Sequence, residues 1–205
     1  MKTRERILHK SLELFNELGE PNVTTLLISD ELEISPGNLY YHFKSKIDIL
    51  TELFDWYEKE MNALLDVPDE PMDIEDQWFF LHLVFESIAR DQFLYKDVVN
   101  VLARHERLRS RFQRIIAKKQ KATLQALNNL LKQGRLNASP AEIQALSENI
   151  VLTATFWISY ANVAKNQVDE MTLAQGVYQV ISQVVPFLEG EQREMLEQLK
   201  NVYLK

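Results

Sequence analysis

Residues 35–46 read Ser-Pro-Gly-Asn-Leu-Tyr-Tyr-His-Phe-Lys-Ser-Lys, and this stretch decides the fold of the chain. Ser35 is suited to cap a helix that has Pro36 at its first position. That helix carries two tyrosines and a histidine, and lysines follow where the next helix begins. A short helix of this composition is suited to insertion into the major groove of DNA.

The preceding residues predict a second short helix. Thr24 or Thr25 can serve as its N-cap. Its apolar residues Leu27, Ile28 and Leu32 can face a core. A short turn then leads to the helix at Ser35, so the two helices form a helix-turn-helix.

Composition narrows the class of protein. The chain has 205 residues, of which 46% are hydrophobic, so it can bury a core in one or two domains. It has no cysteine, which excludes disulfides and thiolate metal sites. The chain opens on an amphipathic pattern instead of a secretory leader, and its longest uncharged stretch, residues 150–164, is too short and polar to span a membrane. We therefore expect a cytoplasmic protein with no membrane partner.

The charge balance is unusual for a protein that binds DNA. The net charge is −7, and residues 1–50 contain six Lys and Arg against eight Asp and Glu. A DNA-binding surface in this part must therefore gather its few cations on one side. We expect modest non-specific affinity that is sensitive to salt.

Hydrophobic periodicity predicts helices almost throughout, and no segment has the alternation of a strand. The first helix should end at Gly19, and a linker should contain Pro68 and Pro71. The other predicted helices are 45–65, 73–90, 93–103, 108–131, 139–165, 171–188 and 192–204. We expect an all-α chain with a three-helix DNA-binding domain at 1–48 and a helical ligand-binding and dimerisation domain at 49–205.

Residues 3–50 resemble the N-terminal domain of the TetR family of transcriptional repressors, most clearly in Leu-Tyr-Tyr-His-Phe-Lys-Ser-Lys at 39–46. The resemblance implies phosphate contacts by Thr25, Tyr40 and Lys46. It implies that the part of the helix nearest the bases contains Pro36, Gly37, Asn38 and His42. The expected DNA-binding set also includes Ser35 and Tyr41.

One residue departs from the family pattern in the turn. Glu33 stands where the family usually has glycine, so it must adopt the turn conformation with some strain, or the turn is altered. The residues on the recognition helix also have a second interpretation. A Leu-Tyr-Tyr-His-Phe run is more often core, and Leu39 and Phe43 are expected to be core, but the three residues between them cannot all point inward.

Two further patterns have alternative interpretations. His82 and Glu86 have the spacing of a metal-binding pair, but without a third ligand a packed or pocket-lining histidine is favoured. We expect no metal, no cofactor and no enzyme, since no nucleophile turn or phosphate loop is present. A basic stripe contains Arg107, Arg111, Arg114, Lys118 and Lys121; it is a solvated face, or it contacts DNA flanks or acidic residues of the first domain.

The second domain is rich in aromatic residues, most of which should pack in its core. Helical bundles also bind small molecules in apolar cavities that contain a few polar groups. The resemblance implies an inducer in this domain. The candidate pocket residues are Trp78, His82, Phe85, Phe112, Thr153, Trp157 and Tyr160.

The helix predicted at 143–164 is apolar around nearly its whole circumference, so it needs cover from its own domain and from a partner. Two helices from each chain would then form a two-fold interface. We expect this homodimer interface to include Ile150, Val177, Ile181 and Val184.

Together these patterns favour a homodimeric regulator, more specifically a repressor, that binds a double-stranded DNA operator and leaves it when a small apolar or amphipathic effector binds. The main alternative is a scaffold that binds another protein, with DNA as a co-ligand or no longer bound.

Overall fold

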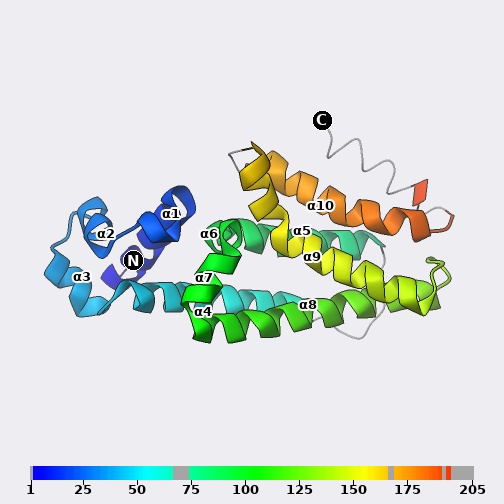
Figure 1. Cartoon of the computed structure of the whole chain (residues 1–205), viewed down its shortest axis with the longest axis horizontal. Helices are drawn as coiled ribbons and strands as arrows, with labels where there is room; N and C mark the ends of the chain where they lie inside the picture. The colour runs from blue at the N-terminus through cyan, green and yellow to red at the C-terminus, as the bar shows by residue number, and fades with distance from the viewer. Residues whose placement is uncertain (1, 67–73, 166–168, 191–192, 195–205) are drawn as a thin grey trace. The chain divides into compact units, whose positions relative to one another are not determined.

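The computed structural model describes residues 2–66, 74–165, 169–190 and 193–194, and most of them are helical (Figure 1). No β-strand occurs in these ranges, where a single antiparallel bridge joins Leu136 to Leu188. The α-helices are α1 (Thr3–Leu18), α2 (Thr25–Glu31), α3 (Pro36–His42), α4 (Lys46–Leu65), α5 (Ile74–Arg90), α6 (Gln92–Lys96), α7 (Val98–Arg104), α8 (Glu106–Lys132), α9 (Pro140–Lys165) and α10 (Glu170–Val184). Two 3₁₀ turns, η1 (Glu20–Asn22) and η2 (Val185–Phe187), complete the list. The all-α prediction is confirmed.

The helix ends lie where the sequence signals predict them. Gly19 follows α1 with a φ of 81°, a conformation that glycine adopts without strain. Thr24 caps α2, and Ser35 caps α3. At the start of α9, the Ser139 Oγ accepts a hydrogen bond from the backbone N–H of Glu142, whose carboxylate accepts one from the backbone N–H of Ser139.

One predicted segment is divided in the structure, and two others lie wholly or mostly outside the described residues. The segment predicted at 93–103 forms two helices, α6 and α7, because Asp97 between them has φ −139° and ψ 43°. The proline linker with Pro68 and Pro71, and nearly all of the helix predicted at 192–204, lie outside the described residues.

The chain forms two compact units. Unit 1 contains residues 1–60 and 91–112, and unit 2 contains residues 61–90 and 113–205. This division does not follow the boundary predicted at residue 48, because α4 continues through that point and its first turns pack within unit 1. The predicted boundary between functional domains remains a prediction.

In unit 1, α1 contacts both α2 and α6, and α2 contacts α3. The Tyr57 and Tyr95 hydroxyls, both buried, hydrogen-bond to each other. Aromatic packing extends this core to Phe112, whose ring centroid is 5.9 Å from that of Tyr95. The largest fully buried side chains of the unit are Ile7, Leu8, Phe15, Ile28, Leu39, Phe43, Ile49, Leu50, Phe54, Tyr57 and Tyr95. Because α3 shares this core, the recognition helix is held rigidly on unit 1.

In unit 2, α9 and α10 lie side by side, and α10 also packs on α5 (Figure 1, yellow, orange and green). Gly176 on α10 lies against side chains of both α5 and α9. A Cβ atom there would lie 2.4 Å from Phe85 Cε1 and 2.6 Å from Trp157 Cδ1. Any residue with a Cβ at this position would therefore force Phe85 and Trp157 to shift.

Candidate nucleic-acid interface

The turn between α2 and α3 contains the strained residue that the sequence predicts. Glu33 has a φ of 54°, in the left-handed region that side chains with a Cβ rarely adopt. The backbone N–H of Glu33 donates to the carbonyl of Asp30 at 3.0 Å, and that of Ile34 donates to Ser29 at 3.0 Å. The turn thus keeps its hydrogen bonds without glycine, and the strain is local to Glu33.

The recognition helix α3 divides its side chains between core and solvent as expected. Leu39 and Phe43 are buried, with 0% and 2% exposure. Most of the outward face is exposed; it contains Ser35, Pro36, Gly37, Asn38, Tyr40 and Tyr41, with His42 half-buried beside them. Tyr41 is 85% exposed and makes an edge contact with the His42 ring. A tyrosine so exposed on a rigid helix is available to a partner.

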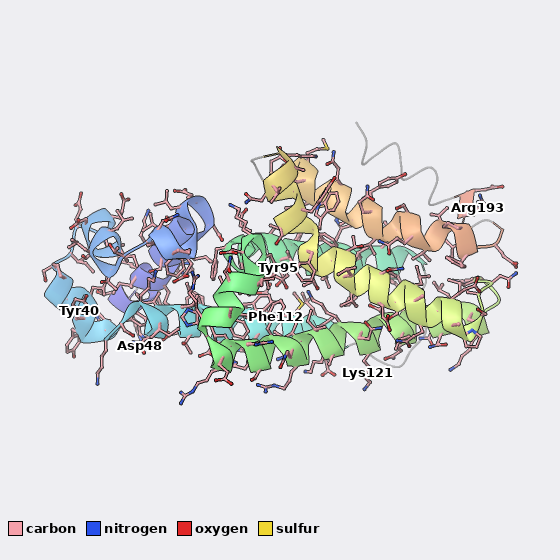
Figure 2. All side chains as sticks on the ribbon, viewed as in Figure 1. Tyr40, Asp48, Tyr95, Phe112, Lys121 and Arg193 are labelled. Carbon is pink, nitrogen blue, oxygen red and sulfur yellow. The ribbon has the colours of Figure 1, made fainter. Side chains whose placement is uncertain are left out.

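Two of the predicted phosphate contacts are adjacent. The Thr25 Oγ1 and the Tyr40 hydroxyl are 2.9 Å apart and share a hydrogen bond. Tyr40, which is labelled on α3 in Figure 2, is 49% exposed. Because only one of the two hydroxyls donates in this bond, the other keeps its proton for an external acceptor. The pair can therefore donate to a phosphate oxygen at the start of α2.

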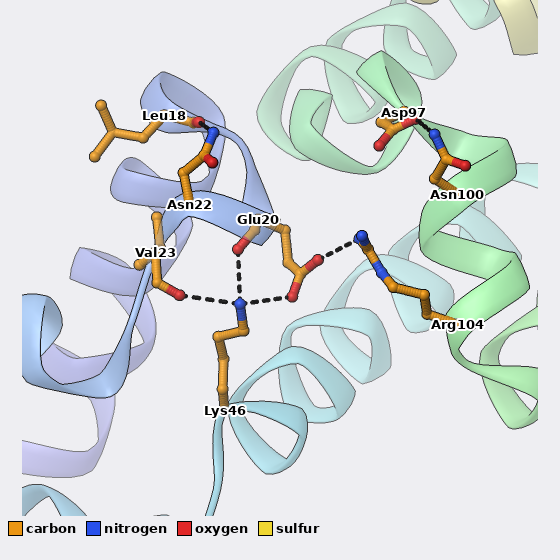
Figure 3. Close-up of polar contacts among 8 residues, drawn as sticks. All are labelled: Leu18, Glu20, Asn22, Val23, Lys46, Asp97, Asn100 and Arg104. Atoms are coloured by element: carbon orange, nitrogen blue, oxygen red, sulfur yellow. Dashed lines mark hydrogen bonds and ion pairs between the residues drawn. The ribbon is translucent and has the colours of Figure 1, made fainter.

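Lys46, the third predicted phosphate contact, is occupied within unit 1. Its Nζ donates to the backbone carbonyls of Glu20 at 2.8 Å and Val23 at 3.0 Å, and it lies 2.9 Å from the Glu20 carboxylate (Figure 3). These three acceptors match the three protons of an ammonium group. The assignment of Lys46 to phosphate remains a prediction, and in this structure its donors are already in use.

Arg4 braces the end of the recognition helix, a role that sequence reasoning missed. Its guanidinium lies 4.2 Å from the centroid of the Phe43 ring, donates to the His42 carbonyl at 2.6 Å and pairs with Glu52 on α4. The sequence pattern gives no sign of these contacts, because Arg4 and its partners are about forty residues apart along the chain. The contact joins α1 to the junction between α3 and α4.

The basic stripe on α8 is divided. Arg111 donates to Asp55 at 2.6 Å and to Glu58 at 2.5 Å, both on α4. The other members are exposed: Arg107, Arg114, Lys118 and Lys121. Arg111 thus binds acidic residues of unit 1, whereas the choice between a solvated face and contact with DNA flanks stays open for the other four.

The predicted effector residues are divided between the two units, and their role remains a prediction. Phe112 belongs to the core of unit 1, whereas Tyr160 is 63% exposed on unit 2. Trp157 packs against Gly176 and donates from its Nε1 to the Thr172 carbonyl at 2.6 Å. The remaining candidates lie on α5 and α9, where Phe85 is buried, Thr153 accepts a hydrogen bond from Gln183, and Trp78 makes an edge contact with His82.

Unit 2 also buries polar and titratable side chains. Ser87 Oγ and Thr155 Oγ1 are buried and have no hydrogen-bond partner within the described parts of the chain. Burial lowers the pKa of Lys119 to about 7. Burial also lowers the pKa of His82, against the opposite effect of the Glu86 carboxylate. Lys119 lies four residues after the core residue Ile115, which is the signal that could have placed it inside.

The predicted dimer residues are mostly buried within their own unit, and their place in an interface remains a prediction. Ile150, Val177 and Ile181 have 8%, 1% and 7% exposure because they fill the core between α9 and α10, and Val184 is partly buried against the same core. These side chains are largely covered by their own unit. The exposed apolar side chains of α9 form a different stripe, which contains Leu152, Phe156, Tyr160 and Val163.

The described residues contain no cluster of three or more potential metal ligands of the His, Cys, Asp and Glu types. Among them, no helix has the length and hydropathy needed to cross a membrane.

Comparison with known proteins places both parts of this architecture in one family. Residues 7–53 match the family described as "Bacterial regulatory proteins, tetR family", and residues 56–196 match the TetR family described as "Bacterial transcriptional repressor". The chain belongs to the TetR family. It is accordingly a DNA-binding transcriptional regulator, not an enzyme.

Several relatives resemble the chain over different lengths. A TetR-family transcriptional regulator from Marinobacter aquaeolei VT8 is 38% identical, covers 99% of both chains and has a TM-score of 0.89. The regulator UidR of Escherichia coli is 24% identical over 89% of this chain and 93% of its own length. The class C tetracycline repressor of Escherichia coli is 29% identical, but the match covers 49% of this chain and 44% of that repressor. KstR2 of Mycobacterium tuberculosis shares the fold, with a TM-score of 0.67, 19% identity and coverage of 92% and 96%.

Proposed function

We propose that this TetR-family regulator is a repressor that binds a palindromic double-stranded operator as a homodimer and is released by a small apolar or amphipathic effector in the cytoplasm. The observation that carries the DNA-binding part is the outward face of α3. That face is rigidly held by Leu39 and Phe43, is exposed from Ser35 to Asn38, and has a hydroxyl pair at its side.

The chemistry of that face divides into two kinds of contact. Thr25 and Tyr40 would donate to phosphate oxygens and thus position the helix without reading sequence. Asn38 would read adenine through its N6 and N7 edge, and Pro36 would contact a thymine methyl group. Gly37 between them allows the backbone to approach the bases, and Tyr41 and His42 extend the contact surface.

We propose that the dimer forms through the outward stripe of α9. Leu152, Phe156, Tyr160 and Val163 recur at three- and four-residue spacing, and all are exposed. A second copy offers the same stripe, so a two-fold interface would bury both. Two recognition helices linked in this way can reach successive major grooves about 34 Å apart.

We place the effector in unit 2, among the helices that contain Ser87 and Thr155. Their hydroxyls are buried without hydrogen-bond partners in the described residues, so a ligand that supplies a polar group would satisfy them. Unit 2 has an apolar core that includes Phe85, Ala154 and Val177, which suits an effector with a largely apolar body. The fold neighbour SmeT is described in complex with triclosan. That ligand belongs to SmeT, but it gives a chemically reasonable first probe here.

The test is selection of DNA fragments by the purified full-length chain, followed by measurement of affinity for the recovered sites. The proposal expects recovered fragments that share a palindrome with half-sites one helical turn apart. Triclosan and related amphipathic compounds should then be titrated with and without the operator. Because linkage is reciprocal, an effector must bind more weakly in the presence of operator by the same factor as it weakens DNA binding. A chain that recovers no DNA sequence but binds a protein would support the scaffold function instead.

A further inference from the structure

Glu20 is a carboxylate that is almost completely buried in the turn after α1. Only 4% of the residue is exposed, although it lies in the short 3₁₀ turn η1 near the surface of unit 1. A buried carboxylate is costly unless cations and donors compensate its charge. The compensating groups around Glu20 come from two different helices.

The first is Lys46, the first residue of α4. As described above, its ammonium group contacts Oε1 of Glu20 and the backbone carbonyls of Glu20 and Val23 (Figure 3). Only the three residues 43–45 separate α3 from α4. Lys46 therefore ties the chain just after the recognition helix to the chain just before α2, and so sets how the two helices of the helix-turn-helix stand relative to each other.

The second is Arg104, the last residue of α7. Its NH2 group donates to Oε2 of Glu20 at 2.6 Å, so the two carboxylate oxygens are divided between α4 and α7 (Figure 3). Two further hydrogen bonds connect α6 to Asn16 on α1. The Lys96 Nζ donates to the Asn16 carbonyl at 2.6 Å, and the Phe93 backbone N–H donates to the Asn16 side chain at 2.9 Å. The end of α1 and η1 are thus attached to both α6 and α7.

These contacts make the position of one cation depend on the other. If Arg104 moves away, the Glu20 carboxylate loses one of its two cationic partners while it remains buried. The carboxylate must then rotate toward water or draw more strongly on Lys46, and either change shifts the start of α4. His105 does not replace Arg104, because burial lowers the pKa of its imidazole and keeps it neutral near pH 7.

We propose that Glu20 and Arg104 are positioning residues for operator binding, and that they act through Lys46, which braces the recognition helix instead of contacting phosphate. The affinity for DNA thereby depends on a side chain of α7, outside the helix-turn-helix. This inference rests on the proposed DNA-binding function.

The test separates a brace from a phosphate contact through salt dependence. A cation that neutralises a phosphate contributes about 0.9 to the slope of log affinity against log salt. Lys46→Met and Arg104→Met should therefore weaken operator binding by about tenfold, the effect of one charge-assisted hydrogen bond, while the salt slope stays that of the parent. Arg109→Met is the matched control, because Arg109 is exposed and lies five residues after Arg104; its affinity should equal that of the parent.

A double-mutant cycle tests the connection through Glu20. Lys46→Met and Arg104→Met together should weaken operator binding by less than the product of their separate effects. Each substitution breaks the same network of Glu20, Lys46 and Arg104. Arg104→Lys keeps the charge and should restore part of the affinity. Thermal unfolding and circular dichroism on each variant establish that it is folded, and Arg104 is exposed enough for substitution to be tolerated.

Three results would overturn the inference. In the first, the Arg104→Met protein binds operator as tightly as the parent despite a lower melting temperature. In the second, the effects of Lys46→Met and Arg104→Met on binding free energy are purely additive. In the third, the salt slope of the Lys46→Met protein falls by about 1 per half-site. A parent chain that selects no DNA would instead overturn the proposed function on which this inference depends.

Discussion

The recognition helix α3 and the long helix α9 begin in the same way but present different surfaces. Each starts with Ser-Pro, and in each the serine hydroxyl accepts a hydrogen bond from a backbone N–H in the first turn. Each also exposes aromatic side chains, Tyr40 and Tyr41 on α3 and Phe156 and Tyr160 on α9. Neither the start signal nor an exposed aromatic residue therefore identifies the partner.

What differs is the chemistry beside the aromatic residues. No Asp or Glu occurs from Ser35 to Lys46, and the α3 aromatics lie among hydroxyl and amide groups that can donate to an anion. On α9 the neighbours are Leu152 and Val163, with 57% and 82% exposure, which have no polar group to offer. The first surface fits a phosphate backbone and base edges, and the second fits another apolar surface.

The largest effect is expected from charge on the α9 stripe. If the proposed dimer forms through this stripe, Leu152→Glu should convert it to a monomer and reduce operator affinity by roughly a hundredfold or more, because linked half-site binding is lost. Sedimentation and operator titration measure the two effects. Ala117→Glu, on the exposed face of α8, is the control and should remain dimeric. A Leu152→Glu protein that still sediments as a dimer would place the interface elsewhere.

The next effect compares two glycines. Gly176→Ala should cost about 1–3 kcal/mol of unfolding free energy, because its Cβ would overlap Phe85 and Trp157. Gly37→Ala is the matched control on α3, where a Cβ would meet only Ser35 Oγ at 3.9 Å. It should leave stability unchanged or raise it by up to about 1 kcal/mol while weakening DNA binding. Urea unfolding of both variants decides; equal losses of stability would contradict the packing argument.

Base reading and backbone contact on α3 can be distinguished by two substitutions. Asn38→Ala should change the preference at one base pair of each half-site by about 1–3 kcal/mol. Tyr40→Phe removes the hydroxyl bonded to Thr25 and should weaken binding to all sequences similarly. Affinities for a set of single-base operator variants provide the measurement. A Tyr40→Phe protein with altered sequence preference would show that this residue reads bases.

The smallest effect concerns the turn before α3. Glu33→Gly should raise the free energy of unfolding by about 0.5–1 kcal/mol, since relief of the positive φ exceeds the added entropy of the unfolded chain. Glu31→Gly, within α2, should instead lower it by about 1 kcal/mol. Denaturant titration of the two variants tests the sign; a less stable Glu33→Gly protein would mean that the Glu33 side chain makes a compensating interaction.

Local features of the candidate site were predictable from the sequence. The caps at Thr24 and Ser35, the strained Glu33, and the division of α3 between Leu39 and Phe43 inside and tyrosines outside all depend on contacts within a few residues. Such contacts depend mainly on side-chain type and backbone geometry, which the sequence states directly.

The partners of charged residues were not predictable in the same way. The sequence predicts a phosphate contact for Lys46 but gives no sign of its ion pair with Glu20. It likewise gives no sign that Arg4 contacts Phe43 and Glu52. A helix that is apolar all round, as predicted at 143–164, does not reveal which side its own unit covers. The structure assigns Ile150 to the core and Leu152 to the surface.

The sequence by itself therefore determined the all-α class, the capped helix starts at Thr24, Ser35 and Ser139, the strained turn and the outward face of the recognition helix. Only the tertiary structure decided that Lys46, Glu20 and Arg104 form one network and that the free stripe of α9 runs from Leu152 to Val163. The physical reason is distance along the chain. Periodicity and capping act over one or two helical turns, whereas an ion pair between residues 20 and 104 exists only after separate helices have packed and water has been excluded around the carboxylate.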